Sequence, residues 1–174
     1  MGVRIIIGNI ISLVAALFLA ASCLVKNKRG IFLCQFMECV LLAISSVLFG
    51  SLAGTTTLLL SAVRNLIVAR ERYTKQMMYI FLVLTIVAGI LANSRGLLGL
   101  MPVIATVEYT ICCYYITGIK AIRCSIFVNM AIWIVYSFLI LDFSTAISDS
   151  IILIVDLAAI VKMHHSEKAL LSEE

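Results

Sequence analysis

Seven apolar stretches joined by short polar links constrain this chain more than any other feature of its sequence. Most of them reach the roughly 20 residues that a helix needs to cross a hydrocarbon core of about 30 Å. The stretches cover approximately residues 5–25, 31–49, 54–70, 77–93, 97–117, 122–141 and 146–162. With 63% hydrophobic and 13% charged residues, the chain lacks the polar surface of a soluble domain. We therefore predict an all-α polytopic membrane protein, a single membrane domain of seven transmembrane helices.

The basic residues between these stretches predict an orientation in the membrane. Ten lysines and arginines fall in alternate links and in the tail, whereas only Arg4 and Arg95 fall on the other side. The larger set comprises Lys26, Lys28, Arg29, Arg70, Arg72, Lys75, Lys120, Arg123, Lys162 and Lys168. Short loops rich in lysine and arginine stay in the cytoplasm. We expect the N-terminus outside and the C-terminus inside, which requires an odd number of helices.

A faint internal repeat with an offset of 91 residues predicts two related units. The evidence lies in the polar positions, because apolar residues match one another by chance in any membrane protein. The offset places Glu38 on Asn129 and Asn65 on Asp156. We expect two parallel three-helix units joined by a linker helix, an arrangement found in several transporter folds. The first unit, the linker, the second unit and the cytoplasmic tail cover 5–73, 77–93, 97–163 and 164–174.

Five segments of the chain carry a resemblance to a known family. They are Gly8–Phe18, Glu38–Ser45, Arg64–Leu66, Pro102–Thr106 and Tyr136–Asp142. In these segments the chain resembles the YgjV-type bacterial inner-membrane family, and the likeness extends over nearly its whole length. The resemblance implies a location in the bacterial inner membrane. The resemblance does not imply an activity for this chain, because none is established for that family.

The arrangement of three, one and three helices is also similar to the wider MtN3-like group, which includes the SWEET sugar uniporters and the KDEL receptor. In SWEET carriers, asparagines of the third and seventh helices face each other across the substrate site. Asn65 and Asp156 occupy those positions here, so the resemblance implies a central site between the two units. SWEET carriers have a proline in each of four helices, whereas this chain has only Pro102. The resemblance therefore does not specify a sugar.

Arg64 is the costliest residue within the apolar stretches. A guanidinium at membrane depth costs about 2.5–3.5 kcal/mol on insertion scales, so it needs a partner. Counted at 1.5 Å per residue, Arg64 and Glu38 both lie roughly 10–12 Å deep on consecutive antiparallel helices. We predict that they form a buried ion pair. The pair could fix helix packing alone or also line a pathway, and the sequence leaves both alternatives open.

Polar residues of the second unit predict a binding site. Asn129 and Trp133 lie four residues apart on one face of the sixth stretch, and Glu108 lies near the middle of the fifth. An indole ring beside an amide suits an amphipathic small molecule, although Trp133 could equally pack in the bundle or face lipid. An acidic residue within a span, such as Asp156, is a functional candidate by default. The predicted site comprises Asn65, Asn129, Trp133 and Asp156, with Glu108 close to it.

Transport of a small solute is the function that these features favour. An amide facing a carboxylate suits a neutral or cationic polar solute, and a non-transporting membrane receptor or assembly subunit on the same scaffold is the alternative. The sequence contains no nucleophile–base pair at one depth, no phosphate loop and no metal motif among its six cysteines. We therefore expect no enzyme activity, cofactor or metal. The expected partners are a small solute and the lipid bilayer, without nucleic acid, and a homodimer is left open.

Cysteine labelling tests the orientation. A probe thiol at Ser94 is expected to react from outside the cell, and one at Thr74 only after permeabilisation, because their links lie on opposite sides of the membrane. The reverse pattern would overturn the predicted topology.

Overall fold

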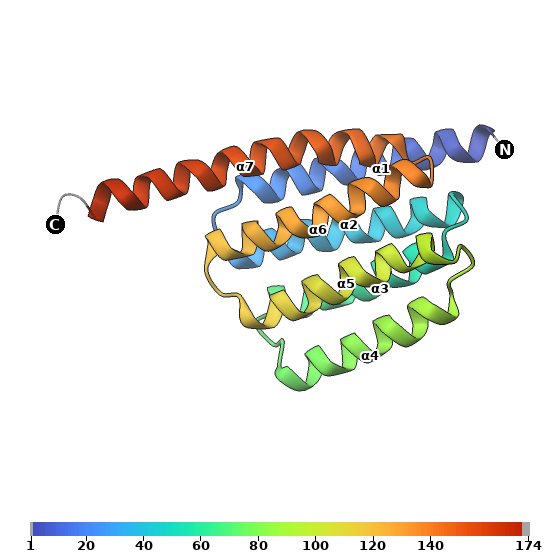
Figure 1. The fold of residues 1–174 in the computed structure, drawn as a ribbon, viewed down its shortest axis with the longest axis horizontal. Helices are drawn as coiled ribbons and strands as arrows, with labels where there is room; N and C mark the ends of the chain where they lie inside the picture. Colours follow the sequence, from blue (N-terminus) through green and yellow to red (C-terminus); the bar gives the residue numbers. More distant parts are fainter. Residues whose placement is uncertain (1, 172–174) are drawn as a thin grey trace.

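The computed structural model describes residues 2–171, which form seven α-helices (Figure 1). They are α1 (Gly2–Leu24), α2 (Lys28–Leu48), α3 (Leu52–Ala69), α4 (Lys75–Leu91), α5 (Leu97–Tyr115), α6 (Ile119–Leu139) and α7 (Phe143–Leu171). The predicted all-α fold class is confirmed. Each helix starts within three residues of the predicted apolar stretch, because the polar links that end the stretches also form the turns.

Five helices, α1, α2, α3, α5 and α6, are long and apolar enough to cross a membrane. Helix α4 is apolar but slightly shorter, with 17 residues. Helix α7 differs most from its predicted bounds, since its backbone continues past residue 162 to Leu171, through most of the segment assigned to the tail. Figure 1 shows this end projecting from the bundle. No proline or glycine follows Phe143 in the sequence, so the residues that most often end a helix are absent.

Polar caps start three consecutive helices. The side chains of Asn27, Ser51 and Thr74 accept hydrogen bonds from the backbone N–H groups of Gly30, Gly54 and Met77 at 2.7, 3.1 and 3.3 Å. Each bond satisfies a donor that has no partner inside the helix. The turns they close are short, so α1 to α4 run antiparallel to their neighbours along the chain (Figure 1).

The helices pack as two facing rows with α4 at one edge (Figure 1). In the first row α1 contacts α2 and α2 contacts α3, and in the second α5 contacts α6 and α6 contacts α7. The rows meet where α1 contacts α7 and α3 contacts α5, while α4 packs against α3 and α5. We call the end that holds the turns at 25–27, 70–74 and 116–118 the basic end. The end that holds residue 2 and the turns at 49–51, 92–96 and 140–142 is the N-terminal end.

Apolar residues cover both the inside and the outside of this bundle. The largest buried cluster lies toward the basic end and includes Leu19, Ile31, Phe32 and Ile122. Large apolar side chains are also exposed on the outer surface, especially on α1, α4 and α7. A soluble monomer rarely exposes apolar area on this scale, whereas a lipid bilayer covers it at no cost.

Close contact between α4 and α5 depends on a glycine. A Cβ atom added at Gly89 would lie 2.5 Å from Cγ2 of Val103 and 3.6 Å from Cγ2 of Thr57. Because Val103 and Thr57 have short β-branched side chains, neither can swing away to make room. Glycine at this position therefore sets how closely α4 approaches α3 and α5.

Replacing Gly89 by leucine is expected to destabilise the bundle. Overpacking a tight contact costs about 1–3 kcal/mol, so Gly89→Leu should lower the thermal unfolding midpoint of the purified protein in detergent. Gly2→Leu is the matched control, because a side chain at Gly2 meets nothing within 4 Å. Equal midpoints for the two variants would contradict the packing described for α4.

Candidate functional site

A cavity of about 60 Å³ lies between the two rows of helices, about midway along them. At roughly 10–15 Å³ per water molecule, it has space for a few waters or a small solute. Residues of six helices line it, and many are polar although the surrounding bundle is apolar. The polar lining residues are Gln35, Glu38, Ser61, Arg64, Asn65, Thr106, Tyr109, Asn129, Trp133, Thr145 and Asp149.

The Arg64 guanidinium is only 2% exposed and is held by neutral groups. Its Nη1 donates to Thr110 Oγ1 at 2.8 Å and to the Thr106 carbonyl at 3.4 Å. Nε and Nη2 donate to Asn65 Oδ1 at 3.3 and 3.1 Å. The ring of Tyr109 also lies beneath it, with its centroid 4.9 Å from Cζ. These contacts connect α3 to α5 and place one positive charge in the cavity wall.

Glu38 lines the same cavity from α2, on a half-buried side chain. The predicted ion pair with Arg64 is not among the contacts of the described residues, where Arg64 bonds to Asn65 and α5 instead. Counting residues along the helices correctly predicted that Glu38 and Arg64 lie near each other, because both line this cavity. It could not show that α5 presents a hydroxyl, a carbonyl and an aromatic ring to the guanidinium.

Three of the predicted binding residues line the cavity: Asn65, Asn129 and Trp133. The Asn65 amide donates to Cys39 Sγ at 3.7 Å, and the Asn129 amide donates to the Ala105 carbonyl at 2.6 Å. The Trp133 ring packs edge-on against Tyr136, with centroids 5.6 Å apart. Both amides are therefore oriented by the bundle, and the indole forms a fixed wall.

Glu108 does not line the cavity but lies directly behind Asn129. Its Oε2 accepts from the Asn129 amide at 3.5 Å, and its Oε1 accepts from Cys112 Sγ at 3.2 Å. Glu108, predicted as a binding residue close to the site, therefore contacts a lining residue without lining the cavity itself.

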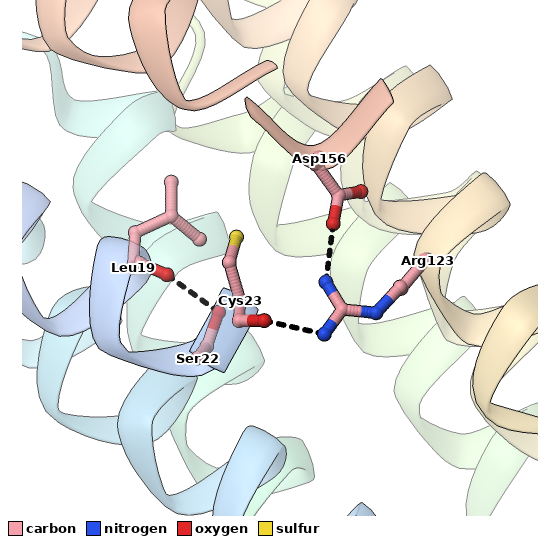
Figure 2. A network of polar contacts seen from close by, with 5 residues as sticks. All are labelled: Leu19, Ser22, Cys23, Arg123 and Asp156. Atoms are coloured by element: carbon pink, nitrogen blue, oxygen red, sulfur yellow. Dashed lines mark hydrogen bonds and ion pairs between the residues drawn. The ribbon is translucent and has the colours of Figure 1, made fainter. Parts of the chain in front are cut away.

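Asp156 lies elsewhere than predicted. It forms an ion pair with Arg123 near the basic end, with 2.5 Å between Oδ1 and Nη1, and it does not line the cavity (Figure 2). Arg123 Nη2 also donates to the carbonyl of Cys23, the next-to-last residue of α1 (Figure 2). Asp156 and Arg123 are only 1% and 7% exposed. Arg123 thus connects α7 and α1, and Figure 2 shows its bond to Cys23 joining the two rows.

The 91-residue offset shows why Asn65 and Asp156 have different surroundings. It aligns Arg123 with Phe32, so the first half of the sequence has no arginine at the position of Arg123, and Asn65 contacts its neighbour Arg64 instead. Phe32 instead stacks on Tyr109, with centroids 6.3 Å apart. The sequence pattern assigns Arg123 to a loop, so it does not predict that Arg123 pairs with Asp156. In the structure Arg123 is a buried residue of α6.

Asp149 is a charged lining residue that the predicted site lacks. It is 4% exposed and lines the cavity from α7. It precedes Asp156 by seven residues, which is two helical turns and hence the same helix face. This seven-residue spacing is the feature of the sequence that could have indicated Asp149 as a lining residue. The choice between the two carboxylates depended on where Arg123 lies.

A second polar network closes the N-terminal end. Ser12 on α1 donates to Asp142 Oδ2 at 2.9 Å, and its hydroxyl lies 2.7 Å from that of Ser45 on α2. Thr145 also donates to Asp142, through its N–H and its hydroxyl. Tyr136 on α6 hydrogen-bonds to Ser51 in the turn before α3. The two rows are therefore joined at this end too.

These features define a class, an integral membrane protein built as a helical bundle around a polar cavity. Comparison with known proteins then identifies the family. Residues 6–167 match the family model Imp-YgjV, described as a bacterial inner membrane protein, and the chain belongs to this family. Together with its apolar helices, this makes it a multi-pass inner membrane protein. No curated protein and no solved structure matches it, so the similarity to the SWEET group stays a prediction.

Double-mutant cycles test the two charged pairs. Removing one partner of a buried ion pair typically costs about 3–5 kcal/mol, because the other charge is left uncompensated. We expect Arg123→Gln and Asp156→Asn each to lower the unfolding midpoint in detergent, and the double variant to recover part of the loss. The matched cycle of Arg64→Gln with Glu38→Gln should show much weaker coupling. Equal coupling in both cycles would contradict the contacts described here.

Proposed function

We propose that this protein is a small-solute transporter whose substrate occupies the central cavity. The observation that carries the proposal is a polar cavity at the middle of an apolar bundle. Lining residues come from both rows, with Glu38 and Asn65 on one side and Asn129 and Asp149 on the other. Ionisable residues in spans are costly and mark solute or ion pathways. A bundle that served only as a scaffold would be more stable with these positions apolar.

Polar connections between the rows at both ends support a transport cycle. At the basic end, Arg123 on α6 reaches Cys23 on α1. At the N-terminal end, Asp142 accepts from Ser12 on α1, and Tyr136 bonds to Ser51. Each set can break while the other holds, which would open the cavity to one side at a time. Alternating access by rocking two helical bundles about a central site has this requirement.

The order of the helices within the rows supports the two-unit arrangement. In the first row the order is α1, α2, α3, and it faces α7, α6, α5 in the second row. A two-fold axis parallel to the helices, running between α2 and α6, would exchange α1 with α5 and α3 with α7. The cavity would then lie on that axis, as in carriers built from parallel repeats. The helix α4 would serve as the linker.

The charge of the lining favours neutral or cationic substrates. Two carboxylates and one guanidinium line the cavity, which leaves one net negative charge when all three are ionised. An anion entering this site would face two like charges at close range, and a low dielectric strengthens their repulsion. Under the proposed orientation, the basic end would face the cytoplasm.

Uptake into proteoliposomes tests the proposal. Radiolabelled ethanolamine, alanine and glycerol represent cationic, zwitterionic and neutral solutes, and at least one is expected to enter faster than into empty liposomes. Trp133→Ala and Asn65→Ala should lower that uptake by about tenfold, because they alter opposite walls of the cavity. Asp156→Asn should also lower it, through the connection at the basic end.

Phe138→Ala is the matched control, since Phe138 lies on the same helix as Trp133 but is 46% exposed on the outer surface. Its uptake is expected to equal that of the wild type. Uptake that survives Trp133→Ala and Asn65→Ala unaltered would exclude the cavity as the route. Absence of uptake for every solute would favour the receptor or assembly subunit instead.

A further inference from the structure

We infer that the cavity binds an organic ammonium ion, with Glu38 and Asp149 as its counter-charges. The inference rests on the proposed function, because it names the substrate class of the same site. It starts from two carboxylates that face one cavity from opposite rows of the bundle, Glu38 on α2 and Asp149 on α7.

Neither carboxylate is neutralised by another group among the described residues. Within the part of the chain that the structure describes, Glu38 and Asp149 make no hydrogen bond and no ion pair. They interact electrostatically with each other, which is a repulsion when both are ionised. Burying a carboxylate without a cation or a donor is expensive. A bound cation would remove this cost for both groups.

The arginine in the wall does not fulfil that role. Arg64 directs its Nε and both Nη atoms to Asn65, Thr106 and Thr110, and its face to Tyr109. It still contributes one positive charge, so the lining carries one net negative charge rather than two when all three groups are ionised. One monovalent cation therefore balances the site, whereas a dication or an anion leaves it charged.

A buried hydroxyl gives independent evidence for a hydrogen-bonding ligand. Thr106 lines the cavity, is 2% exposed, and its Oγ1 has no hydrogen-bond partner among the described residues. Buried hydroxyls in native proteins nearly always have a partner. A primary ammonium group has three N–H donors. Three acceptors without partners line this cavity: Glu38, Asp149 and Thr106.

The remaining walls suit an organic cation. Leu42, Leu58 and Met130 give the cavity apolar surface, and Trp133 adds an aromatic ring. An alkyl group gains free energy by contacting such walls, and an ammonium is attracted to the face of an indole. The volume of about 60 Å³ limits the ligand to a few heavy atoms in this conformation.

The tryptophan supplies the measurement, because Trp133 is the only one in the sequence and it lines the cavity. The probe is n-propylammonium, and the matched neutral probe is propan-1-ol. We expect a saturable change of tryptophan fluorescence in the purified protein with propylammonium at pH 7, and affinity at least about tenfold weaker for propanol. This comparison needs only the wild type, so it stands even if a variant fails to fold.

Single-residue variants then test which side chains bind the ammonium group. Glu38→Gln and Asp149→Asn should each weaken propylammonium binding by about tenfold, and Thr106→Val should weaken it less. Glu71→Gln is the control, because it removes an exposed carboxylate in the turn after α3, outside the cavity. Equal affinity for propanol, an equal response to potassium chloride at the same ionic strength, or unchanged binding in both acidic variants would overturn the inference.

Uptake separates this inference from the transport proposal. Propylammonium binding without uptake of any solute would support the ammonium site and contradict transport. Uptake of glycerol by a protein that shows no saturable propylammonium binding would support transport and contradict the ammonium site.

Discussion

Burial of the Arg64 charge is the constraint on which the centre of this structure depends. A guanidinium buried in an apolar bundle loses most of its hydration, so the protein must provide acceptors. Helix α5 provides them through the Thr106 carbonyl, the Thr110 hydroxyl and the Tyr109 ring. This solution holds α3 against α5 across the two rows. Because the acceptors are neutral, the positive charge of Arg64 in the cavity wall has no direct counter-ion among the described residues.

The unpaired charges at the centre contrast with the paired groups at the two ends. Toward the basic end, the Arg123–Asp156 pair lies with a large apolar cluster that includes Leu19 and Phe32. At the N-terminal end, Asp142 is saturated by serine and threonine hydroxyls. Acidic residues at both ends thus contribute to cohesion between helices. Glu38 and Asp149 have no such partners within the described part of the chain, and they are the groups that we propose a ligand stabilises.

The site was predictable only in part. The sequence indicates how far along its helix a residue lies, but not which neighbouring helix its side chain faces. Counting residues along each helix placed Glu38, Arg64 and Asn65 at one level, and they do line the same cavity, because the rise of a helix is fixed. It could not identify partners, since each helix presents several faces to several neighbours. Asp149 and Asp156 share one face of α7 at different depths. The position of Arg123 on a neighbouring helix decided which of them stayed in the cavity.

The sequence by itself determined the seven helices, their short turns and the membrane environment, because apolar length and polar links act locally along the chain. It also determined that charged groups would lie inside the bundle, since Arg64 and Glu38 occur well inside apolar stretches. Only the tertiary structure decided how those charges are satisfied. The contacts of Arg64 with α5 and of Arg123 with Asp156 join residues 42 or more and 33 positions apart. Such pairings depend on how the helices are rotated against one another, which local sequence does not encode.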